Sequence, residues 1–188
     1  STAGKVGNAA KFTASQGQSL TVADNAALSM SANGFTLSAW VYLNGSTGMD
    51  QAIVSKVGGG KWEYMVDYME SSKKFRFLAS SNGTDVTEVY SAAVTAGNWY
   101  FVTAWYDAVG TINLQVNDSA AASRSHAGGV HDGTADFTVG TRGGDYMNGR
   151  VDELGLWKRA LTAQERADLY NAGAGNGLSP SAHTFSVD

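Results

Sequence analysis

Short stretches in which apolar and polar residues alternate recur along the whole chain, and this period of two predicts β-strands. The clearest stretch is 35–43, where Phe35, Leu37, Ala39, Val41 and Leu43 form one face and Thr36, Ser38, Trp40 and Tyr42 form the other. Because both faces carry large side chains, we expect this strand to be covered on both sides. Further strands are predicted at 61–68, 73–79, 86–91, 99–106, 111–116 and 137–140.

The region 149–165 predicts a strand followed by a short helix. Leu154 and Leu156 alternate with Glu153 and Gly155, and strict alternation places Asp152 on the same face as the two leucines. That carboxylate is therefore expected to point inward, where it needs a partner, a hydrogen-bond cage or a metal. Thr162-Ala163-Gln164-Glu165 is a capping box, so a helix is expected to begin there and to end near Asn171–Gly173.

These elements predict an all-β fold, a two-sheet antiparallel jelly-roll sandwich with one short C-terminal helix. Residues 1–172 are predicted to form the sandwich domain. Residues 173–188, which open with Gly-Ala-Gly-Asn-Gly, are predicted to be a flexible tail or linker.

Composition removes several classes of function. The chain has 188 residues, 23 glycines, one proline and no cysteine, which excludes disulfides, thiolate zinc sites and cysteine catalysis. Its net charge of −4 offers no basic surface for nucleic acid. Membrane insertion is not expected either, since no apolar stretch approaches the roughly 20 residues that span a bilayer. Few charges with many Ser, Thr, Asn and Gly residues indicate a secreted or surface-exposed protein, on a cell or a virion.

In this order, the segments 4–12, 20–24, 35–42, 53–56, 98–102, 117–118 and 149–157 resemble a laminin-G-like (concanavalin A-like lectin/glucanase) domain. The resemblance covers roughly residues 4 to 172. It implies the jelly-roll fold, but that fold carries lectins, adhesion modules and glycan-cleaving enzymes alike. The family usually has another strand before this opening, so the chain is expected to be part of a larger chain or assembly.

Catalysis would require two carboxylates roughly 5 to 9.5 Å apart. The best candidates are Glu63, Asp67 and Glu70. Glu63 and Asp67 share a face of an ideal strand, yet four residues separate them by about 13 Å. The related glucanases place Glu, Asp and Glu at positions i, i+2 and i+5, which puts Met65 where the first Glu belongs. The spacing therefore predicts that the protein is not an enzyme and that these are solvated strand carboxylates.

Candidate ligand-binding residues are an aromatic residue that follows a triple glycine and a group in a glycine-rich loop: Trp62, Arg142, Asp145, Tyr146 and Asn148. Exposed aromatic rings can stack on sugar rings while nearby polar groups bond hydroxyls. The alternative is that these rings fill the core, as large aromatics do in sandwiches.

Asp24 and Asp152 form the candidate metal site. In the related fold the early strand runs near the closing strand, so the two carboxylates are expected to approach each other. Oxygen ligands of this kind suit calcium, and the resemblance implies the same ion. The alternative is that Asp152 caps backbone amides.

The sequence thus favours a non-catalytic binding module whose partner is carbohydrate or a protein surface. The alternative is a structural or adhesive domain, such as a virion or cell-surface decoration. A glycan-cleaving enzyme ranks third.

Overall fold

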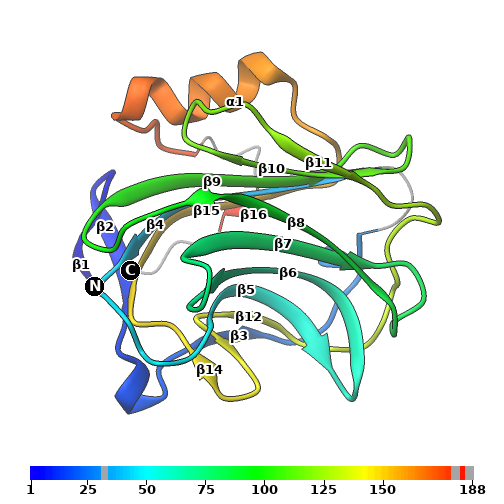
Figure 1. Cartoon of the computed structure of the whole chain (residues 1–188), viewed down its shortest axis with the longest axis horizontal. Helices are drawn as coiled ribbons and strands as arrows, with labels where there is room; N and C mark the ends of the chain where they lie inside the picture. Colours follow the sequence, from blue (N-terminus) through cyan, green and yellow to red (C-terminus); the bar gives the residue numbers. More distant parts are fainter. Residues whose placement is uncertain (31–33, 179–182, 185–188) are drawn as a thin grey trace.

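Two antiparallel β-sheets face each other in the computed structural model, which describes residues 1–30, 34–178 and 183–184 (Figure 1). The eight-stranded sheet contains, in spatial order, β1 (Thr2–Ala3), β2 (Asn8–Phe12), β15 (Gly149–Trp157), β4 (Phe35–Leu43), β9 (Trp99–Tyr106), β10 (Thr111–Val116) and β11 (Ala122–Ser125), with β16 (His183–Thr184) beside β15. The six-stranded sheet contains β3 (Leu20–Val22), β12 (Phe137–Val139), β5 (Gln51–Gly58), β6 (Lys61–Met69), β7 (Lys74–Ser80) and β8 (Val86–Ala93). The predicted jelly-roll sandwich is confirmed.

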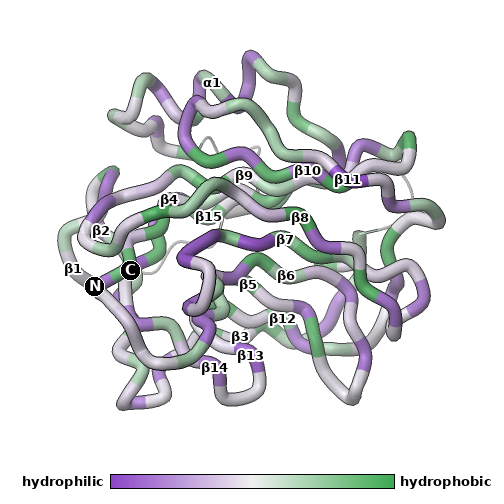
Figure 2. The backbone as a smooth tube through the Cα atoms, in the orientation of Figure 1, coloured by the Kyte–Doolittle hydropathy of each residue, from purple (hydrophilic) through white to green (hydrophobic). Residues whose placement is uncertain are grey.

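The core lies between the two sheets and is built from alternate residues of each strand. On β4, Phe35, Leu37, Ala39, Val41 and Leu43 all belong to it. The opposite face of β4 is buried as well, since Thr36, Ser38 and Trp40 are at most 2% exposed. Hydrophobic and hydrophilic positions are interspersed along the strands of both sheets, as strands with two different faces require (Figure 2).

Helix α1 (Ala163–Tyr170) covers the outer face of the eight-stranded sheet (Figure 1). The predicted capping box begins it, because Thr162 accepts from the Glu165 amide and Glu165 accepts from the Thr162 amide. Asn171, in a left-handed conformation, ends it, and a 3-10 turn, η2 (Asn171–Gly173), follows. Tyr170 stacks on Trp40 with ring centroids 5.8 Å apart, so the helix covers this tryptophan on the outer face of β4.

A β-bulge in β15 corrects the predicted orientation of Asp152. The register with β4 shifts between Asp152 and Gly155, and Glu153 has φ of 46°. The extra residue reverses the alternation, so Val151, Leu154 and Leu156 enter the core while Asp152 faces away from it. The prediction of strict alternation was wrong, because a bulge inserts one extra residue into the strand and the alternation of apolar and polar residues in the sequence does not reveal it.

The segment 173–178, predicted to begin a linker, is hydrogen-bonded to its surroundings. The Gly175 and Asn176 amides donate to Tyr170 and Leu169, and the Leu178 amide donates to the Glu153 carboxylate. Beyond it, β16 pairs with Gly155 and Leu156 of β15. The remainder of the predicted tail, 179–182 and 185–188, lies outside the described residues.

Among the described residues, no helix has the length and apolar character needed to cross a membrane.

The capping box predicts a measurable loss when Thr162 is truncated. Thr162→Ala removes the oxygen that accepts from the Glu165 amide, and the free energy of unfolding should fall by about 1 kcal/mol. The melting temperature should fall by roughly 2 to 4 °C. Thr134→Ala, at an exposed threonine whose side chain makes no hydrogen bond with the part of the chain that the structure describes, should leave the melting temperature unchanged and is the matched control. Equal melting of both variants would contradict the cap.

Candidate functional site

A tight hairpin, β13 (Thr141–Arg142) and β14 (Asp145–Tyr146), joins β12 to β15. It carries three of the five predicted ligand-binding residues, Arg142, Asp145 and Tyr146, and Asn148 follows it. Its turn is Gly143-Gly144, and both glycines have positive φ, as a two-residue hairpin turn requires. The base of the hairpin is closed by the Met147 amide, which donates to Gly140 O at 2.9 Å. Met147 itself is fully buried. The hairpin is therefore anchored in the core and held in one orientation.

One side of the hairpin lies over Trp62. The Arg142 guanidinium is 5.3 Å from the Trp62 ring centroid and also pairs with Asp145. The ring is partly buried against a small cluster on the outer face of the six-stranded sheet, Ala52, Met65 and Leu78. Trp62, Arg142 and Asp145 are thus brought together, but they bind one another. A sugar could stack on that ring face only after Arg142 had left it.

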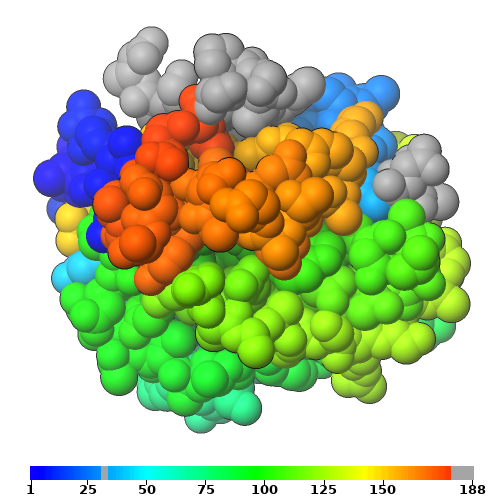
Figure 3. Space-filling model, turned by 90° about the horizontal axis from the view of Figure 1, so that it is seen from above, coloured from blue at the N-terminus to red at the C-terminus, as the bar shows by residue number. Residues whose placement is uncertain are grey.

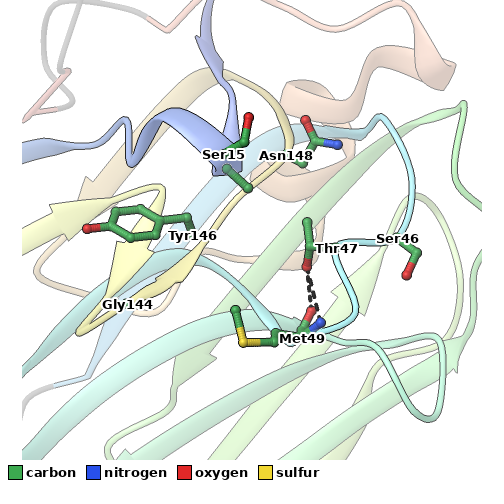
Figure 4. A pocket seen from close by; sticks show the side chains of 8 residues that line it. Ser15, Ser46, Thr47, Met49, Gly144, Tyr146 and Asn148 are labelled. Carbon is green, nitrogen blue, oxygen red and sulfur yellow. Dashed lines mark hydrogen bonds between the residues drawn. The ribbon is translucent and has the colours of Figure 1, made fainter.

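The other side of the hairpin borders a pocket of about 350 Å³. A 3-10 turn, η1 (Ala14–Gln16), and the loop 44–50 complete its walls (Figure 4). Both remaining predicted residues, Tyr146 and Asn148, line it. The full lining consists of Ala14, Ser15, Ser46, Thr47, Met49, Gly144, Tyr146 and Asn148.

The loop 44–50 is fixed to the hairpin by a buried glutamine. Gln51 is fully buried; its Oε1 accepts from the Asn148 amide at 2.9 Å and its Nε2 donates to Gly45 O at 2.9 Å. The Asn44 amide donates to Asn148 O, also at 2.9 Å. These bonds join two segments about a hundred residues apart in the sequence. Because they hold both walls together without a ligand, the pocket is preformed.

Three polar groups in the pocket have no hydrogen-bond donor role within the part of the chain that the structure describes. These are the hydroxyls of Ser15 and Tyr146 and the side-chain Nδ2 of Asn148, whose Oδ1 accepts from Asn44. Thr47, in contrast, donates to Met49 O at 2.8 Å. Tyr146 and the exposed side chain of Met49 add apolar surface, and the Tyr146 ring extends away from the loop 44–50 and lies against Gly17 (Figure 4). Uncommitted hydroxyl and amide groups beside an aromatic ring suit a neutral, hydroxyl-rich ligand.

The carboxylates considered for catalysis are held by cations. Glu63 bonds Lys56 at 2.7 Å, and both are at most 1% exposed. Lys56 of β5 pairs with Tyr64 of β6 and Val57 pairs with Trp62, so Glu63 is the unpaired residue of a β-bulge. Its side chain therefore reaches Lys56, whose strand partner Tyr64 belongs to the core. Asp67 instead pairs with Arg76 at 2.6 Å. The prediction of solvated carboxylates sharing one face was therefore wrong for Glu63 and Asp67.

Their electrostatics follow from this burial. Loss of solvent raises the pKa of both Glu63 and Asp67, against the opposing effects of Lys56 and Arg76. Glu70, nearer the surface, has its pKa lowered by the hydrogen bond from Lys73. Each acid is thus paired with a basic side chain, although Lys56 also pairs with Asp24 and Arg76 also pairs with Glu88. At Glu63 and Asp67 the loss of solvent outweighs these partners.

Asp24 and Asp152, predicted to share a metal ion, are committed to different partners on different sheets. Asp24 follows β3 and pairs with Lys56 at 2.8 Å. Asp152 accepts from the Lys5 and Val6 amides at 2.7 and 2.8 Å and from the Glu153 amide at 2.9 Å. N–H donors and an ammonium occupy the positions in which a cation would sit, so these residues do not fit a calcium site. Within the described ranges, no group of three or more His, Asp or Glu side chains is arranged for a metal.

The sequence did not reveal the second wall of the pocket. Gly45-Ser46-Thr47-Gly48 could be recognised as a loop from its composition. Nothing local indicates that this loop and Ser15 meet the hairpin, since the link depends on Gln51.

A family model described as the concanavalin A-like lectin/glucanases superfamily matches residues 14–165, and the chain belongs to this superfamily. The predicted family is confirmed. A search among curated proteins finds no significant match.

Solved structures share the fold at low identity. The binding domain of Paraclostridial Mosquitocidal Protein 1 superposes with a TM-score of 0.75 and 14% identity over 92% of this chain and 45% of that chain. The binding domain of Botulinum Neurotoxin DC in complex with SialylT gives 0.64 and 14%, over 82% and 39%. The same toxin's binding domain with rat synaptotagmin II gives 0.62 and 13%, over 82% and 40%. The chain therefore spans less than half the length of these structures.

The contacts of Asp152 predict that it acts as a structural anchor. Asp152→Asn replaces an accepting oxygen with an NH₂ group, leaving at least one partly buried backbone N–H without an acceptor. The free energy of unfolding should fall by about 1 to 3 kcal/mol. Thermal unfolding should show the same loss in chelator and in millimolar calcium.

Asp118→Asn, at an exposed carboxylate, is the matched control and should melt like the wild type. A loss of stability in Asp152→Asn that appears only when calcium is present would instead favour a metal ligand.

Proposed function

We propose that this domain is a non-catalytic carbohydrate-binding module and that the pocket beside the β13–β14 hairpin holds one sugar residue of a glycan. The observation that carries the proposal is that uncommitted polar groups from two separate segments, Ser15 on η1 and Tyr146 and Asn148 at the end of the hairpin, line one preformed pocket. Its volume of about 350 Å³ lies within the roughly 300 to 1,000 Å³ of small-molecule sites.

The lining matches the chemistry of a sugar ring. A pyranose has an apolar C–H face and a rim of hydroxyls, and the pocket has an aromatic ring and a methionine beside hydroxyl and amide groups. Ligand hydroxyls can accept from Asn148 Nδ2 and exchange hydrogen bonds with Ser15 and Tyr146. Because Gln51 holds the walls in place, little conformational entropy is lost on binding.

The same lining supports binding without cleavage. It contains no Asp or Glu, whereas glycosidases use a pair of carboxyl groups flanking the scissile bond. Glu63, Asp67 and Glu70 are each paired with a basic side chain. Because these carboxylates are engaged in ion pairs, we expect the domain to bind a glycan without hydrolysing it.

A protein-binding or adhesive domain is the second candidate, and a neurotoxin binding domain of the same fold is known in complex with a protein. The large hydrophobic residues that are exposed in the described part of this chain lie on separate elements: Leu20 on β3, Met49 in the loop 44–50, Val86 on β8 and Val109 in the β9–β10 turn. An interface of that kind usually presents a contiguous apolar patch. The pocket therefore favours a glycan.

We infer that the module acts in a secreted or surface-exposed protein, in keeping with the composition and with the toxin binding domains that share its fold. Its low charge and polar, glycine-rich surface suit that setting.

A glycan array should first identify a neutral ligand, and calorimetry should then compare variants. Tyr146→Ala removes the apolar wall and one hydroxyl, so affinity should fall at least about tenfold, or ~1.4 kcal/mol. Tyr146→Phe keeps the ring and should lose only a few-fold. Both variants should melt close to the wild type, because Tyr146 is partly exposed.

Trp62→Ala is the control for the rest of the hairpin, since Arg142 already covers that ring. Its affinity should match the wild type, although its stability should fall. Wild-type affinity in Tyr146→Ala, or loss of binding in Trp62→Ala, would place the glycan elsewhere. Failure of every array glycan to bind would favour the adhesive alternative.

A further inference from the structure

A second pocket, of about 300 Å³, lies on the outer face of the eight-stranded sheet. It is formed between the β10–β11 turn and the first turns of α1, where the helix lies against β9 and β10 (Figure 3). It shares no lining residue with the hairpin pocket. Its charged residues are Arg166 and Asp118, and its amide side chains are Gln115, Asn117 and Gln164.

Arg166 is held rigidly at this pocket. Its guanidinium lies 4.0 Å from the ring centroid of Trp105, its Nε donates to Gln115 Oε1 at 2.8 Å, and its Nη1 donates to Leu161 O at 2.7 Å. Nη2 makes no hydrogen bond within the described residues. The planar group is therefore fixed by stacking and two hydrogen bonds, with one edge nitrogen left to bind a ligand.

The charge of Arg166 is not balanced by a carboxylate. Arg76, Arg142 and Arg159 each pair with Asp or Glu, whereas Arg166 makes no ion pair with any described residue. Burial without such a partner lowers the pKa of Arg166 from its ordinary value. A pre-oriented, partly desolvated cation with a free N–H edge is a binding site for a carboxylate.

The other groups of the pocket complement a ligand that also has hydroxyls. Asn117 Oδ1 accepts from the Phe101 amide, which leaves its NH₂ group as a further donor. Gln164 Nε2 donates to Asp168, which leaves its Oε1 as an acceptor, and the exposed Asp118 carboxylate is a second acceptor. These acceptors would take hydroxyl hydrogens.

We propose that this pocket binds an acidic sugar residue, a hexuronate, with its carboxylate on Arg166 and Asn117 and its hydroxyls on Asp118 and Gln164. A monoanion with hydroxyl groups fits better than a phosphate dianion, because Asp118 in the same pocket repels negative charge. The proposal does not depend on the hairpin pocket, which lies among other elements and contains no cation in its lining.

The direct test is NMR on the wild-type protein, with methyl α-galacturonide as the probe and methyl α-galactoside as its neutral control. Addition of the uronide should shift the Arg166 Nε–Hε signal in a saturable manner, while the signal of the exposed, ion-paired Arg159 stays constant. The uronide should bind at least about tenfold more tightly than the galactoside. Equal affinities, or an unchanged Arg166 signal, would overturn the proposal.

Two further comparisons identify the ligand class and the site. Arg166→Gln, checked for folding by its melting curve, should lose the preference for the uronide, and Tyr146→Ala should keep it. If Arg166→Gln does not fold, the wild-type titration alone decides. N-acetylaspartate amide should bind more weakly than the uronide, and equal or tighter binding would instead indicate a protein carboxylate and overturn the sugar assignment.

Discussion

The buried carboxylate of Asp152 joins the beginning of the chain to its closing strand, and both pockets depend on the position of that strand. By accepting from the amides of Lys5 and Val6, Asp152 holds the N-terminal segment on β15. Gly4 passes so close to this carboxylate that a side chain there would collide with Asp152 Oδ2. The β13–β14 hairpin ends just before β15 and α1 begins just after it. An error in the placement of β15 would therefore displace both sites.

The two pockets are rigid for different reasons, and each reason indicates a different ligand. At the hairpin pocket, the side chain of Gln51 joins two segments by hydrogen bonds to their backbones, and the free polar groups that line the pocket are uncharged. At the helix pocket, the fixed element is the guanidinium of Arg166, held by Trp105 and Gln115. The first arrangement selects hydroxyls around an apolar ring face and the second selects a carboxylate.

Local patterns in the sequence predict the parts of this structure that depend on neighbouring residues. The two-faced strand 35–43 and the capping box at Thr162 are examples, because alternation and N-capping are set within a few positions. The bulges at Glu63 and near Glu153 cannot be recognised from such patterns, so the orientations predicted for the side chains of Glu63 and Asp152 were wrong. The sequence singled out Tyr146 and Asn148 in the glycine-rich loop, and both line the pocket. It did not indicate the partner loop, because Gln51 links the two across the fold. Arg166 was missed because the sequence presents it as an ordinary exposed helix residue.

The most direct test of the central claim is a map of the glycan on the protein. Backbone amide shifts of ¹⁵N-labelled protein should be followed while the neutral glycan selected on the array is added. The account predicts saturable shifts at Gly144, Tyr146 and Asn148 on the hairpin and at Thr47 on the facing loop, with the Trp62 indole signal unchanged. Shifts that centre on Trp62 and Arg142, or that spare the hairpin pocket altogether, would contradict it.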